Sequence, residues 1–150
     1  MSKTPIEIDM LVDSALWSGL EADLTRALLA AAAAEGAAGT VCLFLGADEA
    51  LARLNAEFRG KEGPTNVLSF PAGEGAAPGF LGDIALAAET IAREAAEQGK
   101  TIESHAAHMA VHGFLHLLGY DHIVDVDAAV MEDRERVILA SLGIADPYAE

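Results

Sequence analysis

The chain has 150 residues, of which 52% are apolar and 22% charged, and its 24 acidic and 9 basic residues give a formal net charge of −15. This length and apolar content indicate one compact domain and exclude a disordered or fibrous protein. The negative charge argues against binding to nucleic acid through a broad basic surface, so any contact with phosphate groups must be local.

The sequence shows neither a candidate membrane span nor the pattern of a secretory signal. Its longest apolar candidate, Ala27–Ala34, is much shorter than the roughly 20 residues that cross a bilayer. Cys42 is the single cysteine and lies in an apolar run, so it forms no disulfide within the chain and is expected to be a small core residue. We therefore expect a cytoplasmic protein.

The first part of the chain predicts two strands separated by a helix. Apolar residues alternate with polar or small ones over residues 6–12, which is typical of a strand. Leucines at helical spacing predict a helix over Ala15–Ala34, which Gly36 and Gly39 end. The apolar run Thr40–Leu45 predicts a short buried strand.

A second helix and a hairpin are expected next. Asp48 is placed to cap a helix that Gly60 and Gly63 stop. The strands Asn66–Phe70 and Leu81–Leu86 flank a loop rich in glycine and proline, so a β-hairpin is predicted there. The apolar face of the helix comprises Leu51, Leu54 and Phe58.

The rest of the chain is predicted to be helical. Three helices are expected, over Ala87–Gln98, Ile102–Leu118 and about Val126–Leu142, and Asp125 and Asp127 suit the N-terminus of the last one. The predicted fold is therefore a single layered α/β (α+β) domain, in which a mixed sheet of about four strands packs with about five helices.

A group of histidines is the most informative feature for function. His112 and His116 are four residues apart, so on a helix their imidazoles project from the same face. Gly119 can end the helix in a left-handed conformation and turn the chain, which brings His122 back as a third ligand. Three imidazoles suit zinc and leave a fourth position for water, as in a catalytic metal site at the C-terminal end of this helix.

The alternative is a helix whose histidines are merely exposed or buried, because histidine is common near helix C-termini. Against it, the histidines form a stripe of their own beside a separate apolar stripe on the same predicted helix. The apolar stripe comprises Val111, Phe114, Leu115 and Leu118, and the histidine stripe comprises His108, His112 and His116. This grouping favours a metal site.

The same ligand spacing occurs in metzincin proteases, where a glutamate that acts as general base follows the first histidine. In this chain Gly113 takes that position. A peptidase of that class is therefore disfavoured, although zinc alone can lower the pKa of a bound water toward ~7.

The segment HGFLHLLGYDH over residues 112–122 closely resembles the signature of the YbeY family of zinc-dependent endoribonucleases. Further blocks of the chain resemble the family in the same order, so the resemblance covers roughly residues 40–143. These blocks are Leu54-Asn55, Phe58-Arg59, Lys61, Thr65, Val67–Pro71, Leu81–Ile84, Met131, Glu135, Ile138-Leu139 and Leu142-Gly143.

The resemblance implies that His112, His116 and His122 hold one Zn²⁺ ion and that Arg59 is catalytic. A planar guanidinium can hold two phosphate oxygens, so zinc and Arg59 would form a small cationic patch on an acidic protein. On sequence alone, Arg59 is equally a surface or helix-capping residue next to Gly60.

The resemblance also implies the substrate and the partners. It implies cleavage of single-stranded RNA in rRNA maturation at the 3′ end of the small-subunit rRNA, and a role in ribosome quality control. The partners that it implies are the small ribosomal subunit, ribosomal proteins and the GTPase Era.

Four further residues are candidates for contacts with the metal ligands or the substrate: Lys61, Asn66, His108 and Asp121. Asn66 stands where the family often carries aspartate, and its amide can accept a hydrogen bond but cannot take up a proton. Asp121 is either a base or, more simply, a turn residue after Gly119. A solvated helix face accounts for His105 and His108 equally well.

Two other functions remain open at this stage. The ligand spacing is compatible with a metal-dependent hydrolase of another substrate, such as a peptide. Alternatively, the protein is a ribosome-assembly factor without turnover, in which the metal serves stability.

Overall fold

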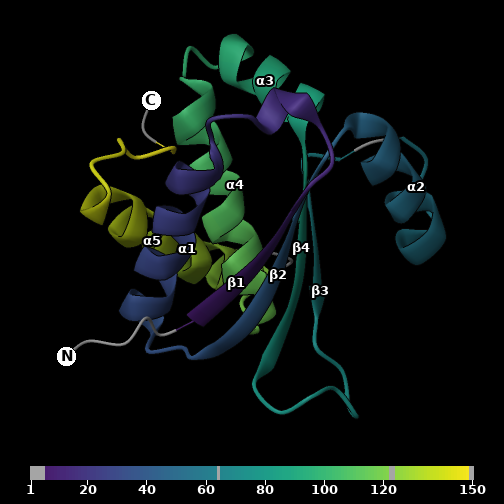
Figure 1. Cartoon of the computed structure of the whole chain (residues 1–150). Coiled ribbons are helices and arrows are strands. Elements are labelled where there is room, and N and C mark those ends of the chain that lie inside the picture. The colour runs from purple at the N-terminus through teal and green to yellow at the C-terminus, as the bar shows by residue number, and fades with distance from the viewer. Residues whose placement is uncertain (1–5, 64, 122–123, 149–150) are drawn as a thin grey trace.

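The computed structural model describes residues 6–63, 65–121 and 124–148 (Figure 1). Within these residues the predicted single layered domain is confirmed, with four strands and five α-helices. In chain order the elements are β1 (Ile6–Val12), the 3₁₀ turn η1 (Ala15–Trp17), α1 (Glu21–Glu35), β2 (Gly39–Gly46), α2 (Asp48–Arg59), β3 (Val67–Pro71), β4 (Phe80–Ala87), α3 (Ala88–Glu97), α4 (Ile102–Leu117) and α5 (Asp125–Ser141). No helix in these ranges has both the length and the apolar character needed to cross a bilayer.

The four strands form one mixed sheet in the order β1-β2-β4-β3. The first three strands of that order are parallel to one another, and β3 runs antiparallel to β4 as the predicted hairpin. Pro71 ends β3 at the edge of the sheet, where a missing N–H donor is tolerated. This edge strand packs against α4, the helix that carries the histidines.

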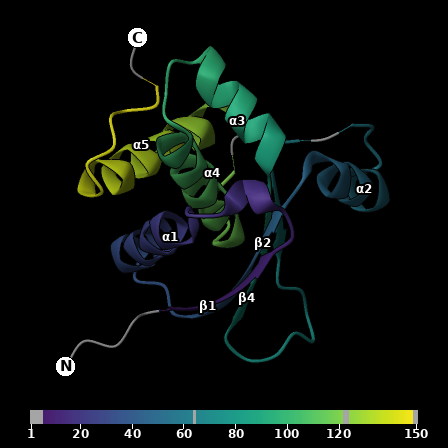
Figure 2. The same cartoon turned by 45° about the horizontal axis from the view of Figure 1, so that its top comes forward.

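Helix α4 occupies the centre of the molecule. Figures 1 and 2 show α1, α4 and α5 on one face of the sheet and α2 on the other. One side of α4 is fully buried through Val111, Phe114 and Leu115. Because the apolar side of α4 is fixed in the core, the direction of its histidine side is fixed as well.

The helix predicted over Ala15–Ala34 is interrupted, which corrects that boundary. A 3₁₀ turn ends at Trp17, the chain turns at Gly19 with φ of 88°, and α1 begins only at Glu21. Trp17 is buried, and its indole Nε1 donates a hydrogen bond to the carbonyl oxygen of Gly46 at 2.8 Å. This tertiary contact and the left-handed glycine override the leucine periodicity.

Asp48 does not cap its own helix, because it is the first residue of α2. Its carboxylate instead accepts hydrogen bonds from the backbone N–H and the hydroxyl of Thr90 in the first turn of α3, at 2.9 and 2.8 Å. In return, Glu89 accepts a hydrogen bond from the backbone N–H of Asp48 at 2.8 Å. The predicted apolar face of α2 is also only partly correct, since Phe58 is 59% exposed.

Candidate metal centre

His112 and His116 project from α4 one helical turn apart, as their spacing predicts. Their Nε2 atoms face each other at 3.2 Å. Thr101 caps the start of the helix, since its hydroxyl accepts a hydrogen bond from the backbone N–H of Ser104, and the helix is held by its buried apolar side. The separation of the two imidazoles is therefore set by a rigid helix and not by a loop.

Each of the two rings is oriented by an acceptor at its other nitrogen. Nδ1 of His112 donates to Oε2 of Glu135 at 2.7 Å, and Nδ1 of His116 donates to the backbone carbonyl oxygen of Tyr120 at 2.9 Å. When both rings are neutral and carry their proton on Nδ1, each Nε2 presents a lone pair. This is the arrangement typical of histidines that bind a metal through Nε2.

The distance between the Nε2 atoms fits a shared metal ion. Two nitrogens bound to one tetrahedral Zn²⁺ at about 2.0–2.1 Å lie about 3.3 Å apart, close to the 3.2 Å between the Nε2 atoms of His112 and His116. Two lone pairs held this close repel each other unless a cation lies between them. The donor set therefore fits a borderline-soft divalent ion.

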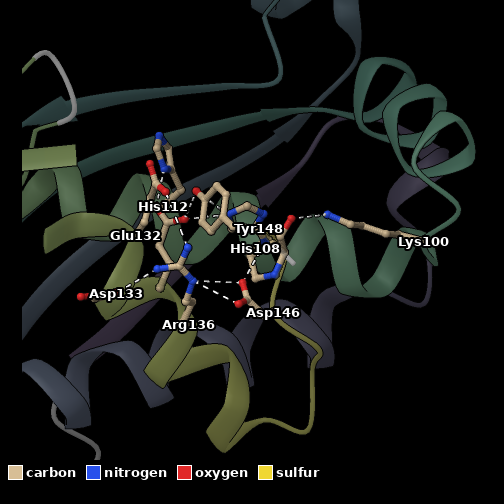
Figure 3. A network of polar contacts seen from close by, with 10 residues as sticks. Lys100, His108, His112, Glu132, Asp133, Arg136, Asp146 and Tyr148 are labelled. Carbon is tan, nitrogen blue, oxygen red and sulfur yellow. Dashed lines mark hydrogen bonds and ion pairs between the residues drawn. The ribbon is translucent and has the colours of Figure 1, made fainter. Parts of the chain in front are cut away.

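Glu135 of α5 is the anchor of His112. The side chain is fully buried, and its carboxylate accepts hydrogen bonds from His108 Nε2 at 2.7 Å, from His112 Nδ1 at 2.7 Å and from the hydroxyl of Tyr148. Figure 3 shows these three donor residues close together. Burial alone would raise the pKa of Glu135, but the hydrogen bonds from its three partners lower that pKa to about 2. A buried, ionised carboxylate thus lies directly behind the candidate ligand.

Tyr120, the anchor of His116, is positioned by the turn that ends α4. Gly119 has φ of 102°, the left-handed conformation predicted for it. The hydroxyl of Tyr120 then donates to Glu35 of α1 at 2.6 Å, and Arg134 of α5 donates to the same carboxylate at 2.7 Å. The hydrogen bond to Glu35 raises the pKa of Tyr120. Contacts from two helices thus fix the carbonyl that orients His116.

Arg59 lies at the end of α2 and is exposed, and it reaches the edge of the sheet. Its NH2 group donates to the backbone carbonyl oxygen of Ser69 at 2.6 Å, and its guanidinium lies over the ring of Phe70 at 5.5 Å. Ser69 in turn contacts α4, because its hydroxyl donates to the carbonyl oxygen of Gly113 at 3.0 Å. Arg59 is thus held by the strand that touches α4 beside His112.

A cavity of about 390 Å³ lies beside the histidine row. Asn66 forms part of its wall, and its amide donates to Glu94 at 3.0 Å. Glu94 also accepts from Nε2 of His105 at 2.9 Å, and burial lowers the pKa of His105 more than Glu94 raises it. The lining residues are Asn66, Val67, Glu94, Gln98, Lys100, His105, His108, Met109, His112, Pro147 and Tyr148.

Lys61 and Asp121, two further residues predicted for the site, lie just beyond the ends of the helices α2 and α4. Lys61 is exposed just beyond α2, and Asp121 is half-buried after the turn at Gly119. His122 lies outside the described residues. Within residues 6–63, 65–121 and 124–148, no three His, Cys, Asp or Glu side chains form a group that could hold a metal, so His112 and His116 are the part of the predicted ligand set that the structure describes.

Sequence reasoning gave no role in the site to two residues of this network, Glu135, which it named only as part of the family resemblance, and Tyr148. A signal for Glu135 was present, because it interrupts the apolar stripe formed by Met131, Ile138 and Leu139 on its helix, and all four residues are buried. A carboxylate in a buried stripe needs partners. Tyr148 carries no such signal, because it lies in a short irregular segment after α5 that has no periodic pattern.

Comparisons with known proteins show what the chain is similar to in sequence and fold. The sequence model of a family described as Endoribonuclease YbeY matches residues 12–143. The chain is 48% identical to Endoribonuclease YbeY of Parvibaculum lavamentivorans over 98% of this chain and 87% of the relative, and 49% identical to that of Maricaulis maris over 94% and 91%. The solution structure of TM1509 from Thermotoga maritima has a similar fold, with a TM-score of 0.61 at 24% identity over 96% of this chain and all of that one.

Proposed function

Because this chain belongs to the Endoribonuclease YbeY family, we propose that it is a metal-dependent endoribonuclease that cleaves single-stranded RNA in rRNA maturation. The observation that carries the metal dependence is the pair of Nε2 atoms of His112 and His116 at 3.2 Å, each ring held by an acceptor at Nδ1. We propose His112, His116 and His122 as ligands of one Zn²⁺ ion, which when bound would polarise a phosphate oxygen or activate water.

In this proposal Arg59 binds the phosphate whose bond is cut. A guanidinium carries five N–H donors, of which the contact with the Ser69 carbonyl oxygen uses one. The exposed side chain therefore keeps enough donors for two non-bridging phosphate oxygens, on which charge develops as the bond breaks. The contacts with Ser69 and Phe70 restrict its rotamers, so less entropy is lost when phosphate binds.

The proposed site reconciles RNA binding with a formal net charge of −15. A metal ion and one arginine attract a single phosphate locally, whereas the rest of an acidic surface repels the RNA backbone. We therefore propose that substrate selection depends on partners, namely the small ribosomal subunit, ribosomal proteins and the GTPase Era, in the cytoplasm. A role in ribosome quality control belongs to the same proposal.

The surroundings of Gly113 count against a metzincin-like peptidase. Gly113 faces the sheet, where a Cβ atom would lie 2.9 Å from Cγ2 of Ile84 and 3.2 Å from Cγ2 of Val67. The position that holds the general base in those proteases thus leaves no room for a side chain. A metal ion held by His112 and His116 in this chain therefore needs another proton acceptor.

Metal content and RNA cleavage, measured on the same samples of the native chain and of His116→Ala, test the proposal. We expect about one zinc ion per native chain, as for a three-ligand catalytic site, and loss of both metal and single-strand cleavage in His116→Ala. Arg53→Ala, a change on the exposed side of α2, is the control that should keep both properties. Full cleavage by a folded His116→Ala chain would refute the metal mechanism, and stoichiometric metal without cleavage would favour an assembly factor.

A further inference from the structure

The residues after α5 return to the metal centre and are fastened there. Asp146 accepts hydrogen bonds from Nε of Arg136 at 3.1 and 3.2 Å, and the carbonyl oxygen of Pro147 accepts one from Nζ of Lys100 at 3.3 Å. The guanidinium of Arg136 lies over the ring of Tyr148 at 5.2 Å (Figure 3). We call Asp146, Pro147 and Tyr148 the C-terminal clasp.

The clasp brings one hydroxyl to the buried carboxylate behind His112. Tyr148 donates to Oε1 of Glu135, the oxygen that also accepts from His108, and its ring meets the ring of His108 edge-on at 5.5 Å. The other oxygen, Oε2, accepts from His112. Burial and the neighbouring carboxylate of Glu135 raise the pKa of Tyr148, so the hydroxyl keeps its proton as a donor.

We propose that Tyr148 is a positioning residue of the metal centre, acting through Glu135 on His112. Two donors on Oε1 fix the plane of the carboxylate, and this plane sets the direction of the hydrogen bond from Nδ1 of His112 to Oε2. The ring orientation of His112, and with it the direction of its Nε2 lone pair, then depends on a residue from the end of the chain. The inference rests on the proposed metal site.

The family match does not supply this role. The match ends at residue 143, whereas the clasp lies beyond it at residues 146–148. Tyr148 also forms part of the wall of the cavity beside His112 and is 37% exposed. It therefore separates the carboxylate of Glu135 from solvent, and this separation strengthens the hydrogen bonds that orient His112.

Metal titration of the unloaded chain tests the proposal, with Co²⁺ as a visible probe and Zn²⁺ as competitor. Tyr148→Phe removes only the hydroxyl and keeps the ring edge-on to His108 and beneath the guanidinium of Arg136. We expect Co²⁺ affinity to fall about tenfold, the lower end of the effect for partners of metal ligands, with an altered visible spectrum of the bound ion. Glu135→Gln should weaken binding by about 10- to 100-fold, and adding Tyr148→Phe to it should cost nothing more.

A matched control separates positioning from general stability. Thr90→Val removes another hydroxyl-to-carboxylate hydrogen bond, the one to Asp48 at 2.8 Å, which lies between α3 and α2 and away from the histidines. It should lower the melting temperature as Tyr148→Phe does, without changing the Co²⁺ spectrum. A native-like affinity and spectrum in Tyr148→Phe, or additive losses in the double variant, would overturn the role of Tyr148 alone. A native chain that binds neither metal would overturn the metal centre as well.

Discussion

The hydroxyl of Ser69 donates a hydrogen bond to the carbonyl oxygen of Gly113 at 3.0 Å, and this contact joins the edge strand β3 to the helix that carries the histidines. The backbone carbonyl oxygen of the same serine accepts the hydrogen bond from Arg59. One residue of β3 therefore connects the proposed phosphate-binding group with the helix of the proposed metal ligands.

Replacing Arg59 should impair cleavage and leave folding almost unchanged. We expect kcat/KM for single-stranded RNA to fall roughly 100-fold in Arg59→Ala, the usual cost of removing one donor to a developing oxyanion. Arg59→Lys should recover only part of the activity, because an ammonium cannot hold two oxygens in a planar fork. Unfolding in denaturant should change by less than about 1 kcal/mol, since the residue is exposed.

The control for this prediction is Arg53→Ala on the same helix. Arg53 pairs with Glu49 at 3.3 Å on the exposed surface, so its removal should alter neither cleavage nor stability. Cleavage by Arg59→Ala within a few fold of the native rate would exclude Arg59 from the reaction.

Gly113 should not tolerate a side chain. Helix propensity favours Gly113→Ala by about 1 kcal/mol, but overpacking against the sheet costs about 1–3 kcal/mol. The neighbouring atoms would lie 2.9–3.2 Å from the new Cβ atom and belong to β3 and β4, so they have little freedom to move. We expect a net loss of about 1 kcal/mol for Gly113→Ala and a larger loss, without peptidase activity, for Gly113→Glu.

Denaturant unfolding measures this effect, and Gly73→Ala provides the matched comparison. Gly73 has no atom within 4 Å of the place that a Cβ atom would take and no positive φ, so the same substitution there should be neutral or slightly stabilising. A Gly113→Ala chain at least as stable as the native one would show that α4 can move away from the sheet.

Zinc should stabilise the folded chain through the two described histidines. At a zinc concentration 100 times Kd, linkage adds about 2.7 kcal/mol, which raises Tm by roughly 5–10 °C for a chain of this size. His112→Ala should abolish this rise in Tm. His105→Gln should keep it, because His105 contacts Glu94 and neither of the two proposed ligands. Differential scanning fluorimetry with and without zinc measures the shift, and an equal shift in His112→Ala would exclude that ligand.

His105 should make stability depend on pH. Burial, together with the nearby side chains of His108 and Lys100, lowers the pKa of His105 below its ordinary value of 6.5, although Glu94 acts in the opposite direction. The unfolded chain then takes up a proton before the folded one does, so this contribution is complete above pH 6.5 and is lost as the pH falls through the folded pKa.

Unfolding free energies from about pH 8 down to about pH 5.5 should therefore fall more steeply for the native chain than for His105→Gln. The ring signal of His105 in NMR, assigned by its absence in the variant, should titrate below pH 6.5. A midpoint above 6.5 would mean that the contact with Glu94 outweighs burial.

Local sequence signals predicted most of the fold. The hairpin follows from two apolar runs around a loop rich in glycine and proline, and the long helix α4 follows from its apolar stripe. The left-handed turn at Gly119 follows from the absence of a Cβ atom. Each of these features is determined by residues that are close together in the sequence, so the sequence alone could predict it.

The features that sequence reasoning missed depend on distant contacts. Trp17 donates to Gly46, 29 positions away, and this contact separates the turn at Ala15–Trp17 from α1. Asp48 binds Thr90 across 42 positions, so a residue with good capping chemistry caps another helix. Tyr148 reaches His108 over 40 positions, and nothing within the tail itself indicates that destination.

The central position of α4 determines where this protein can vary. The same helix provides Phe114 and Leu115 to the core and His112 and His116 to the proposed metal centre, so a mutation that loosens the core also misplaces the imidazoles. A change in substrate range is then expected in the β3–β4 loop at the rim of the sheet, which can differ without disturbing α4. Laboratory evolution directed at new RNA targets would best start with libraries at that rim.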